Sequence, residues 1–228
     1  MRRPSDIAVT VGTGAATTAL VYRAGQPAAA ALILGHGAGA GQHSPFLVDF
    51  AQALSALGLD VVTFNFLYTE QRRRLPDRAP VLEDAYRAVI EVIHAQLESA
   101  RRALFIGGKS MGGRIATQVA AADAALPVAG VVLLGYPLHP PGQPEKLRDK
   151  HLPLVRRPML FVQGSRDTFG TPDELAPILA ALAPAPAMHV IEGGDHSFKL
   201  SRKTPAEQAQ IYAGIQQTIA AWITAGGK

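Results

Sequence analysis

Three residues of types that catalyse acyl transfer follow short apolar runs along the chain. Ser110 lies in Gly-Lys-Ser-Met-Gly, directly after one run, and Asp167 and His196 each follow a later run. Ser, then Asp, then His is the chain order found where a tight strand-to-helix turn presents a nucleophilic serine. The sequence therefore predicts a nucleophile at Ser110, an orienting carboxylate at Asp167 and a general base at His196.

A serine nucleophile also needs N–H donors for the negative charge that develops on the substrate oxygen. One donor is expected to be the N–H of Met111, directly after the nucleophile. The second is expected from the loop that begins with His-Gly-Ala-Gly after another apolar run. We assign this donor to the N–H of Ala38, with Gly37 as the neighbouring alternative and a candidate substrate-binding residue. His36 is expected to fix the loop through hydrogen bonds rather than to react.

Two glycine-rich segments resemble nucleotide-binding loops, but neither has the required context. Gly-Lys-Ser at 108–110 would need a glycine where Ala103 stands. The segment 35–41 follows an apolar run, but the next helical pattern begins too late, at Ser44-Pro45. His and acidic residues show no metal-ligand spacing, and the chain has no cysteine. We therefore expect no cofactor and no metal.

Apolar runs alternate with helical patterns along most of the chain, which is typical of an α/β fold. The expected strands are 7–11, 17–22, 30–35, 60–66, 103–107, 128–134, 158–163 and 187–191. Helices are expected after Ser44, over 80–98 and 111–122, and after capping boxes that begin at Thr171 and Thr204. The first two strands should form an antiparallel pair, and the others a mostly parallel sheet of about eight strands with helices on both faces. Such a sheet would bring Ser110, Asp167 and His196 to its carboxyl edge.

The chain has 228 residues, no cysteine and a formal net charge of +4. This length is typical of one domain, so we expect residues 1–228 to form a single domain. The hydrophobic content of 48% excludes a disordered chain, and the lack of cysteine excludes disulfides and a cysteine nucleophile. The segment 136–157 is rich in proline and charge and fits no element. We expect it to be a flap beside the site, because it is too short for a separate lid domain.

Several partner classes are not indicated by the sequence. No apolar run approaches the roughly 18 residues of a membrane span, and Pro4 to Asp6 interrupt a signal-peptide pattern, so we expect a cytoplasmic protein that does not bind membranes. No nucleic-acid motif is present, and the oligomeric state is not indicated.

Arg72 to Arg74 follow the strand expected at 60–66. Either they attract anionic substrates at a pocket mouth or they form a solvated loop, and the solvated loop is favoured. Arg72 remains a candidate substrate-binding residue.

Five segments together resemble a small family of α/β-hydrolases. They are HGAG at 36–39, GKSMGGR at 108–114, YPLHPPG at 136–142, QGSRDTFG at 163–170 and DHSF at 195–198. The family is often labelled dienelactone-hydrolase-like, and it includes a vertebrate testis-expressed protein and a subunit of the NSL histone acetyltransferase complex. The resemblance implies an α/β-hydrolase fold with Ser110, Asp167 and His196 as the triad.

The chain departs from this family pattern at two points. Dienelactone hydrolases use a cysteine nucleophile, and this chain has no cysteine. Where relatives often have Phe-Pro-Tyr, this chain has Phe66, Leu67 and Tyr68. This change is expected to reshape the pocket wall, so Tyr68 is a candidate substrate-binding residue.

These observations predict a serine hydrolase that cleaves a small-molecule ester or thioester through an acyl-enzyme on Ser110. Esters and thioesters are favoured over peptides only by analogy with other small serine hydrolases. Three alternatives stay open at this point. The fold could serve as a non-catalytic interaction module, or the same triad could transfer an acyl group to an alcohol or cleave a peptide.

Overall fold

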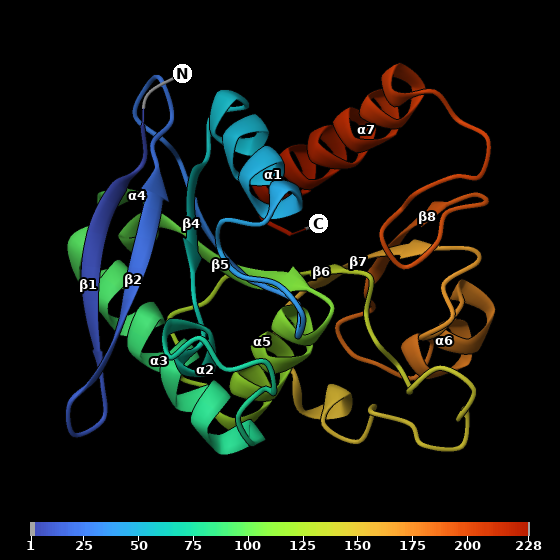
Figure 1. Cartoon of the computed structure of the whole chain (residues 1–228), viewed down its shortest axis with the longest axis horizontal. Helices are drawn as coiled ribbons and strands as arrows, with labels where there is room; N and C mark the ends of the chain where they lie inside the picture. Colours follow the sequence, from blue (N-terminus) through green and yellow to red (C-terminus); the bar gives the residue numbers. More distant parts are fainter. Residues whose placement is uncertain (1–2, 228) are drawn as a thin grey trace.

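The computed structural model describes residues 3–227, and an eight-stranded sheet runs through its middle (Figure 1). The strands are β1 (Ser5–Val11), β2 (Ala15–Tyr22), β3 (Ala31–Gly35), β4 (Asp60–Phe64), β5 (Leu104–Lys109), β6 (Gly130–Leu134), β7 (Met159–Gly164) and β8 (Ala187–Ile191). Their order across the sheet is β1-β2-β4-β3-β5-β6-β7-β8. Strand β2 pairs antiparallel with β1 and with β4, and all other pairs are parallel. The predicted hairpin and mostly parallel sheet are therefore confirmed.

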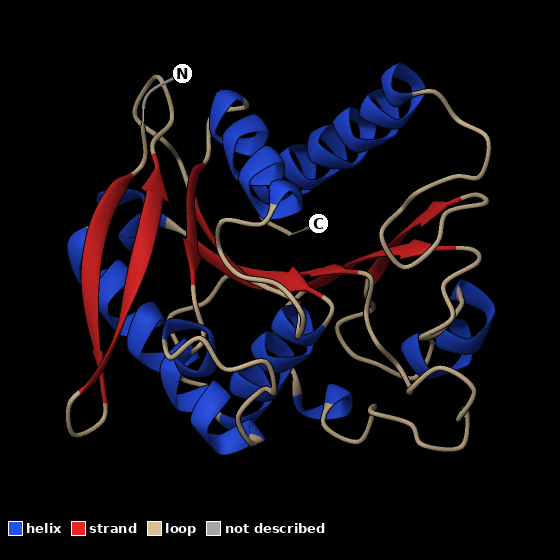
Figure 2. Cartoon of the chain, viewed as in Figure 1, coloured by secondary structure: helices blue, strands red, loops and turns tan. Residues whose placement is uncertain are grey.

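Helices cover both faces of this sheet (Figure 2). They are α1 (Pro45–Ala56), α2 (Leu67–Glu70), α3 (Ala79–Gln96), α4 (Glu98–Arg102), α5 (Met111–Ala122), the 3-10 helix η1 (Leu152–Leu154), α6 (Pro172–Leu179) and α7 (Pro205–Thr224). Helices α1 and α7 lie together on one face, and α3 and α5 pack on the other (Figure 1). Over residues 3–227, none of the helices combines the length and the apolar character that crossing a bilayer requires.

The sheet divides the apolar core into two clusters, one under each helical layer. In β3, Ala31 and Ile33 belong to the cluster with α3 and α5, whereas Leu32 and Leu34 belong to the cluster with α1 and α7. All four side chains are fully buried or nearly so. Because successive side chains point to opposite faces, a strand covered on both sides must be apolar at consecutive positions. This explains why the strands were recognisable as unbroken apolar runs.

The helix boundaries follow local signals in the sequence. Helices α6 and α7 begin with the predicted capping boxes, in which the Thr171 and Thr204 hydroxyls accept from the third helical N–H. The expected helix over 80–98 is interrupted, because Leu97 has an extended backbone that separates α3 from α4. Strand β4 ends at Phe64 rather than at position 66, and the chain enters the short helix α2, which was not predicted.

The segment 136–157 is irregular apart from η1, and it packs against α5. The Tyr136 hydroxyl donates to the Arg148 carbonyl at 2.5 Å, and the Arg148 N–H donates to the Leu138 carbonyl at 2.8 Å. His151 lies 2.8 Å from the Thr117 hydroxyl of α5. These contacts hold the segment in a defined place beside the carboxyl edge of the sheet, and within residues 3–227 no separate lid domain covers that edge.

Candidate active site

Ser110 occupies a strained turn between β5 and α5. Its backbone has φ 53° and ψ −115°, a conformation that is costly for any residue with a Cβ atom. The turn is tight because β3 runs close beneath it. A Cβ on Gly108 or Gly112 would lie 2.3 or 2.2 Å from the carbonyl oxygen of Gly35. The glycines of the pentapeptide are therefore required by packing, and the turn holds Ser110 at the carboxyl end of β5 and the N-terminus of α5.

His196 lies within hydrogen-bond distance of both other predicted catalytic residues. His196 Nε2 is 2.9 Å from Ser110 Oγ, and His196 Nδ1 is 2.7 Å from Asp167 Oδ2. Asp167 follows β7 and His196 follows β8, so neighbouring parallel strands deliver both to the edge that holds the serine. The geometry is that of a nucleophile, a base and an orienting carboxylate.

Asp167 is held by a buried partner that the sequence did not single out. Its side chain is almost fully buried, and Oδ1 accepts from the Phe169 N–H at 2.8 Å. Oδ2 accepts from Gln163 Nε2 at 2.9 Å, and Gln163 Nε2 also lies 2.6 Å from the Gly170 carbonyl. Gln163 Oε1 in turn accepts from the Tyr136 N–H at 2.8 Å. Gln163 thus connects the Asp167 carboxylate to two segments of backbone. Its only signal in the sequence was that it is polar in the otherwise apolar strand β7.

The loop that carries His196 is fixed from three sides. The ring of Phe169 lies over the imidazole with centroids 4.3 Å apart. Asp195 Oδ1 accepts from the N–H groups of Ser197 and Lys199, which orders the loop. Lys109 Nζ donates to the His196 carbonyl at 2.5 Å. These contacts limit the positions that the imidazole can take relative to Ser110.

Lys109 precedes the serine and is largely enclosed. Burial lowers the pKa of its ammonium group to about 8, although the carboxylates of Asp167 and Asp195 act in the opposite direction. Its Nζ also lies 5.5 Å from the centre of the Phe198 ring. Lys109 therefore brings a cation close to the triad, a role that no sequence pattern indicated.

The loop after β3 is shaped by His36, as predicted. Burial lowers the pKa of His36, so the ring is neutral at pH 7. His36 Nε2 accepts from the Phe66 N–H at 3.1 Å, which leaves Nδ1 to donate to the Gly37 carbonyl at 2.8 Å. The Gly37 carbonyl and the Ala38 N–H belong to one trans peptide and point in opposite directions. The Ala38 N–H is therefore directed away from His36.

Neither expected oxyanion donor is occupied by the protein itself. Within residues 3–227, the N–H groups of Ala38 and Met111 have no hydrogen-bond acceptor, and both residues line the cavity that contains Ser110. Met111 is the first residue of α5, where N–H groups have no partner within the helix. Two free donors beside the serine are available to a substrate oxygen.

Tyr68 and Arg72 lie on the other side of the loop 38–40. The Tyr68 side chain is buried, and its hydroxyl donates to the Ala38 carbonyl at 2.8 Å. Neither residue is among the described residues that line the Ser110 cavity. Both line a second, smaller cavity of about 470 Å³ together with Arg73 and Arg74. Helix α2 diverts the chain after β4, so a residue that follows this strand in sequence does not reach the serine.

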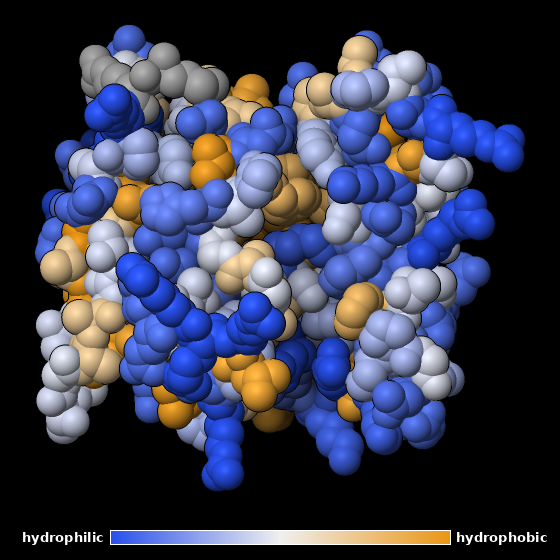
Figure 3. Space-filling view, viewed as in Figure 1, coloured by the Kyte–Doolittle hydropathy of each residue, from blue (hydrophilic) through white to orange (hydrophobic). Residues whose placement is uncertain are grey.

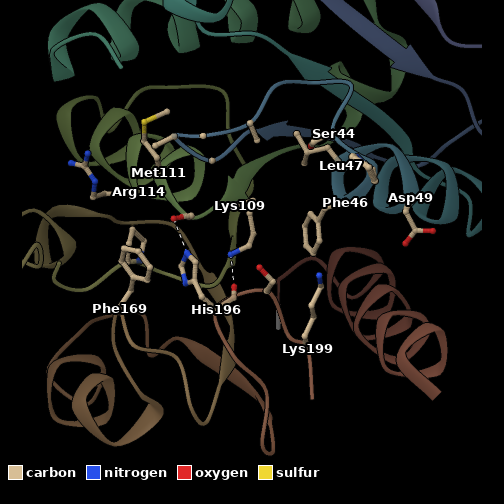
Figure 4. A pocket seen from close by; sticks show the side chains of 18 of the residues that line it. Ser44, Phe46, Leu47, Asp49, Lys109, Met111, Arg114, Phe169, His196 and Lys199 are labelled. Carbon is tan, nitrogen blue, oxygen red and sulfur yellow. Dashed lines mark hydrogen bonds between the residues drawn. The ribbon is translucent and has the colours of Figure 1, made fainter. Parts of the chain in front are cut away.

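The cavity that contains Ser110 has a volume of about 1100 Å³ and opens on one face of the molecule, where a hollow is visible near the centre of Figure 3. Figure 4 shows Arg114, Met111 and Phe169 at one end and Phe46 and Lys199 at the other. Pro137 and Arg148 bring the segment 136–157 into the wall, in accordance with its expected place beside the site. Among residues 3–227, no three His, Asp or Glu side chains gather as metal ligands would.

The strand order and the strained serine turn at the carboxyl edge define an α/β-hydrolase fold. The model of the alpha/beta hydrolase domain family matches residues 28–224, and the chain belongs to that family.

Solved structures of similar fold include three that cover nearly the whole chain. The lidless serine hydrolase XC6422 from Xanthomonas campestris is 22% identical, covers 96% of each chain and has a TM-score of 0.70. A dienelactone hydrolase from Anabaena variabilis is 19% identical, with 98% of this chain and 99% of that chain covered and a TM-score of 0.75. Est1E from Butyrivibrio proteoclasticus, solved with bound ferulic acid, is 12% identical, with 94% and 99% covered and a TM-score of 0.72.

Proposed function

We propose that this protein is a serine hydrolase that cleaves carboxylic esters or thioesters of small molecules. The observation that carries the proposal is the continuous hydrogen-bonded chain from Ser110 Oγ through His196 to Asp167, at distances of 2.9 and 2.7 Å. Ser110, at one end of this hydrogen-bonded chain, lies in a strained turn beside the N–H groups of Ala38 and Met111, which have no acceptor within residues 3–227. A strained backbone is retained where the surrounding structure stabilises it, and such positions cluster at active sites.

The proposed reaction has two halves. Ser110 Oγ attacks the acyl carbon while His196 Nε2 takes the hydroxyl proton, and the carbonyl electrons move onto the oxygen. The N–H groups of Ala38 and Met111 stabilise this oxyanion. The carbonyl re-forms as the bond to the leaving oxygen or sulfur breaks, and His196 returns its proton to the leaving group.

Water completes the cycle by the same route. His196 takes a proton from water as the water oxygen attacks the acyl carbon. The bond from this carbon to Ser110 Oγ then breaks, His196 returns the proton to Ser110 Oγ, and the carboxylic acid is released. Asp167 keeps Nδ1 protonated throughout and stabilises the imidazolium, since it is itself fixed by Gln163 and the Phe169 N–H. The uncovered cavity and the ferulic acid bound to Est1E both favour small substrates.

Hydrolysis of 4-nitrophenyl acetate and of acetyl thiocholine by the purified chain tests the proposal. We expect turnover of at least one of the two, and a loss of about 10³-fold or more in kcat for Ser110→Ala and His196→Ala. Thr18→Ala on the hairpin, remote from the cavity, is a matched control and should retain full activity. A folded protein with no turnover of either class would favour a non-catalytic role for the fold.

A further inference from the structure

Two arginines in the wall of the Ser110 cavity have no acidic partner. Arg114 lies in the first turn of α5 and Arg148 in the segment 136–157, and both line the cavity together with Phe169 and Pro137. Among residues 3–227, no carboxylate oxygen lies within 4.0 Å of either guanidinium group. Arginines that are partly enclosed are normally paired, because removing a charge from water costs free energy.

The hydrogen bonds of Arg114 are also incomplete. Its Nε is buried and has no hydrogen-bond partner within the described residues. Its Nη1 has one long contact of 3.4 Å to Gln118 Oε1. The guanidinium group therefore keeps most of its donors free at one end of the cavity, where Figure 4 shows it beside Met111 and Phe169.

The fold of the irregular segment brings Arg148 into the wall of the cavity that Arg114 also lines. The Tyr136 hydroxyl and the Leu138 carbonyl hold the backbone of Arg148, and its Nη1 lies 3.3 Å from the Pro137 carbonyl. Burial lowers the pKa of Arg114, and the charge of Arg148 lowers it further. Two like charges therefore lie in the wall of one cavity, and an anion bound there would relieve their repulsion.

Other charged groups of the cavity do not neutralise this pair. Asp77 lines the cavity but is paired with Arg73 at 2.5 Å, and Asp49 accepts from Gln216 at 3.0 Å. Glu83 has only a minor influence on Arg114 and forms an ion pair with Arg87. Lys109 adds another positive charge beside the serine. The end of the cavity over α5 is therefore cationic.

We propose that Arg114 and Arg148 form an anion subsite, and that the substrate is an ester or thioester carrying a carboxylate or phosphate on the arm that lies over α5. A guanidinium fork matches the planar oxygens of either group and can bind them with two hydrogen bonds. This inference rests on the proposed hydrolase function for the position of the scissile bond. The arginine pair itself is a binding site whether or not Ser110 reacts.

Matched pairs of substrates test this subsite. Monoaryl adipate is compared with the neutral aryl 6-oxoheptanoate, and 4-carboxyphenyl butyrate with 4-acetylphenyl butyrate, each after subtraction of the enzyme-free rate. One pair places the anion on the acyl arm and the other on the leaving group. We expect kcat/KM for the anionic member of at least one pair to exceed that of its neutral match by about 10-fold or more, with the preference reduced by salt.

Variants then assign the preference to the two arginines. Arg114→Gln and Arg148→Gln should each lower the anionic-to-neutral ratio by about 10-fold, and Arg148→Lys should retain part of it. Arg156→Gln is the matched control, because Arg156 is exposed and lies outside the cavity wall. Circular dichroism and Tm establish that each variant is folded. A ratio near one in both pairs, or a preference that survives both variants, overturns the subsite.

A binding measurement separates this inference from the hydrolase function. Adipate and phenyl phosphate are titrated into the wild-type protein by calorimetry, which distinguishes a carboxylate subsite from a phosphate subsite. Binding of either that is lost in both Gln variants supports the subsite even when no ester is hydrolysed. Hydrolysis of neutral esters without anion preference and without anion binding refutes the subsite and leaves the hydrolase function intact.

Discussion

Replacement of Gln163 by methionine should weaken both the fold and the triad. Methionine has nearly the same length and volume, so the change removes hydrogen bonds while leaving the packing almost intact. In the wild type, Gln163 is fully buried and bridges Asp167, the Gly170 carbonyl and the Tyr136 N–H. Water has no access to replace the lost partners.

The expected magnitude follows from the groups left without partners. The Tyr136 N–H and the Gly170 carbonyl have no other hydrogen bond within residues 3–227. A buried backbone group without a partner costs about 1–3 kcal/mol, so we expect a loss of about 3 kcal/mol in the free energy of unfolding. For a chain of this size, this corresponds to a fall in Tm of about 6–12 °C.

The effect on catalysis should be smaller than the loss of a triad residue. Asp167 keeps the Phe169 N–H and the His196 imidazole as donors and loses only the amide of Gln163. Loss of this one hydrogen bond is expected to reduce kcat about 10-fold, or about 1.4 kcal/mol, with little change in KM.

Differential scanning fluorimetry and ester kinetics measured well below the transition provide the assay. Gln217→Met is the matched control, because Gln217 is exposed on α7 and should change neither quantity. The expected fall in Tm of about 6–12 °C is much larger than the error of the measurement. A Gln163→Met protein whose Tm is within about 2 °C of the wild type, and whose kcat is unchanged, would refute the bridging role.

Three other predictions follow from the same contacts. Gly112→Ala should lower the free energy of unfolding by well over about 3 kcal/mol or prevent folding, because the new Cβ would lie 2.2 Å from the Gly35 carbonyl oxygen. Gly214→Ala on α7 is the control, because a Cβ there would meet open space. It should stabilise the fold by about 0.5–1 kcal/mol in urea unfolding. Burial, reinforced by the charge of Arg114, lowers the pKa of His151 to about 4. Between pH 6.5 and pH 4 the unfolded chain therefore binds a proton that the folded chain does not, and the free energy of unfolding should fall as the pH is lowered through this range. His151→Gln should flatten that fall, and an identical slope in both proteins would contradict the assignment. Because burial lowers the pKa of Lys109 to about 8, the stability of the wild type relative to Lys109→Met should rise between pH 8 and pH 10.5, and a difference that is constant with pH would refute it.

The fold, and the meeting of Ser110, Asp167 and His196 at one edge of the sheet, could be predicted because both depend on local signals. Strands covered on both faces are visible as apolar runs, and the carboxyl ends of parallel strands share one edge. Ser110, Asp167 and His196 could therefore be placed together without knowledge of any side-chain contact. His36 was assigned correctly for a similar reason, since it directly follows a central strand.

Residues that reach the site only through tertiary packing could not be predicted from the sequence. Arg114 and Arg148 line one cavity only because the irregular segment packs against α5, and no periodic pattern in the sequence marks that packing. Arg72 follows a strand at the same edge of the sheet, but it lines the second cavity rather than the Ser110 cavity, because helix α2 comes between the strand and Arg72. The loops after strands diverge too freely for their side chains to be positioned from chain order.

Covalent labelling of Ser110 by a fluorophosphonate tests the central claim most directly. The probe reacts with a serine that is activated by a neighbouring base and leaves a stable adduct, which is located by peptide mass spectrometry. We predict one adduct on the peptide that contains Ser110, none in Ser110→Ala, and slow labelling in His196→Ala. A folded wild-type protein that remains unlabelled, or that is labelled equally after Ser110→Ala, would contradict the assignment of Ser110 as the nucleophile.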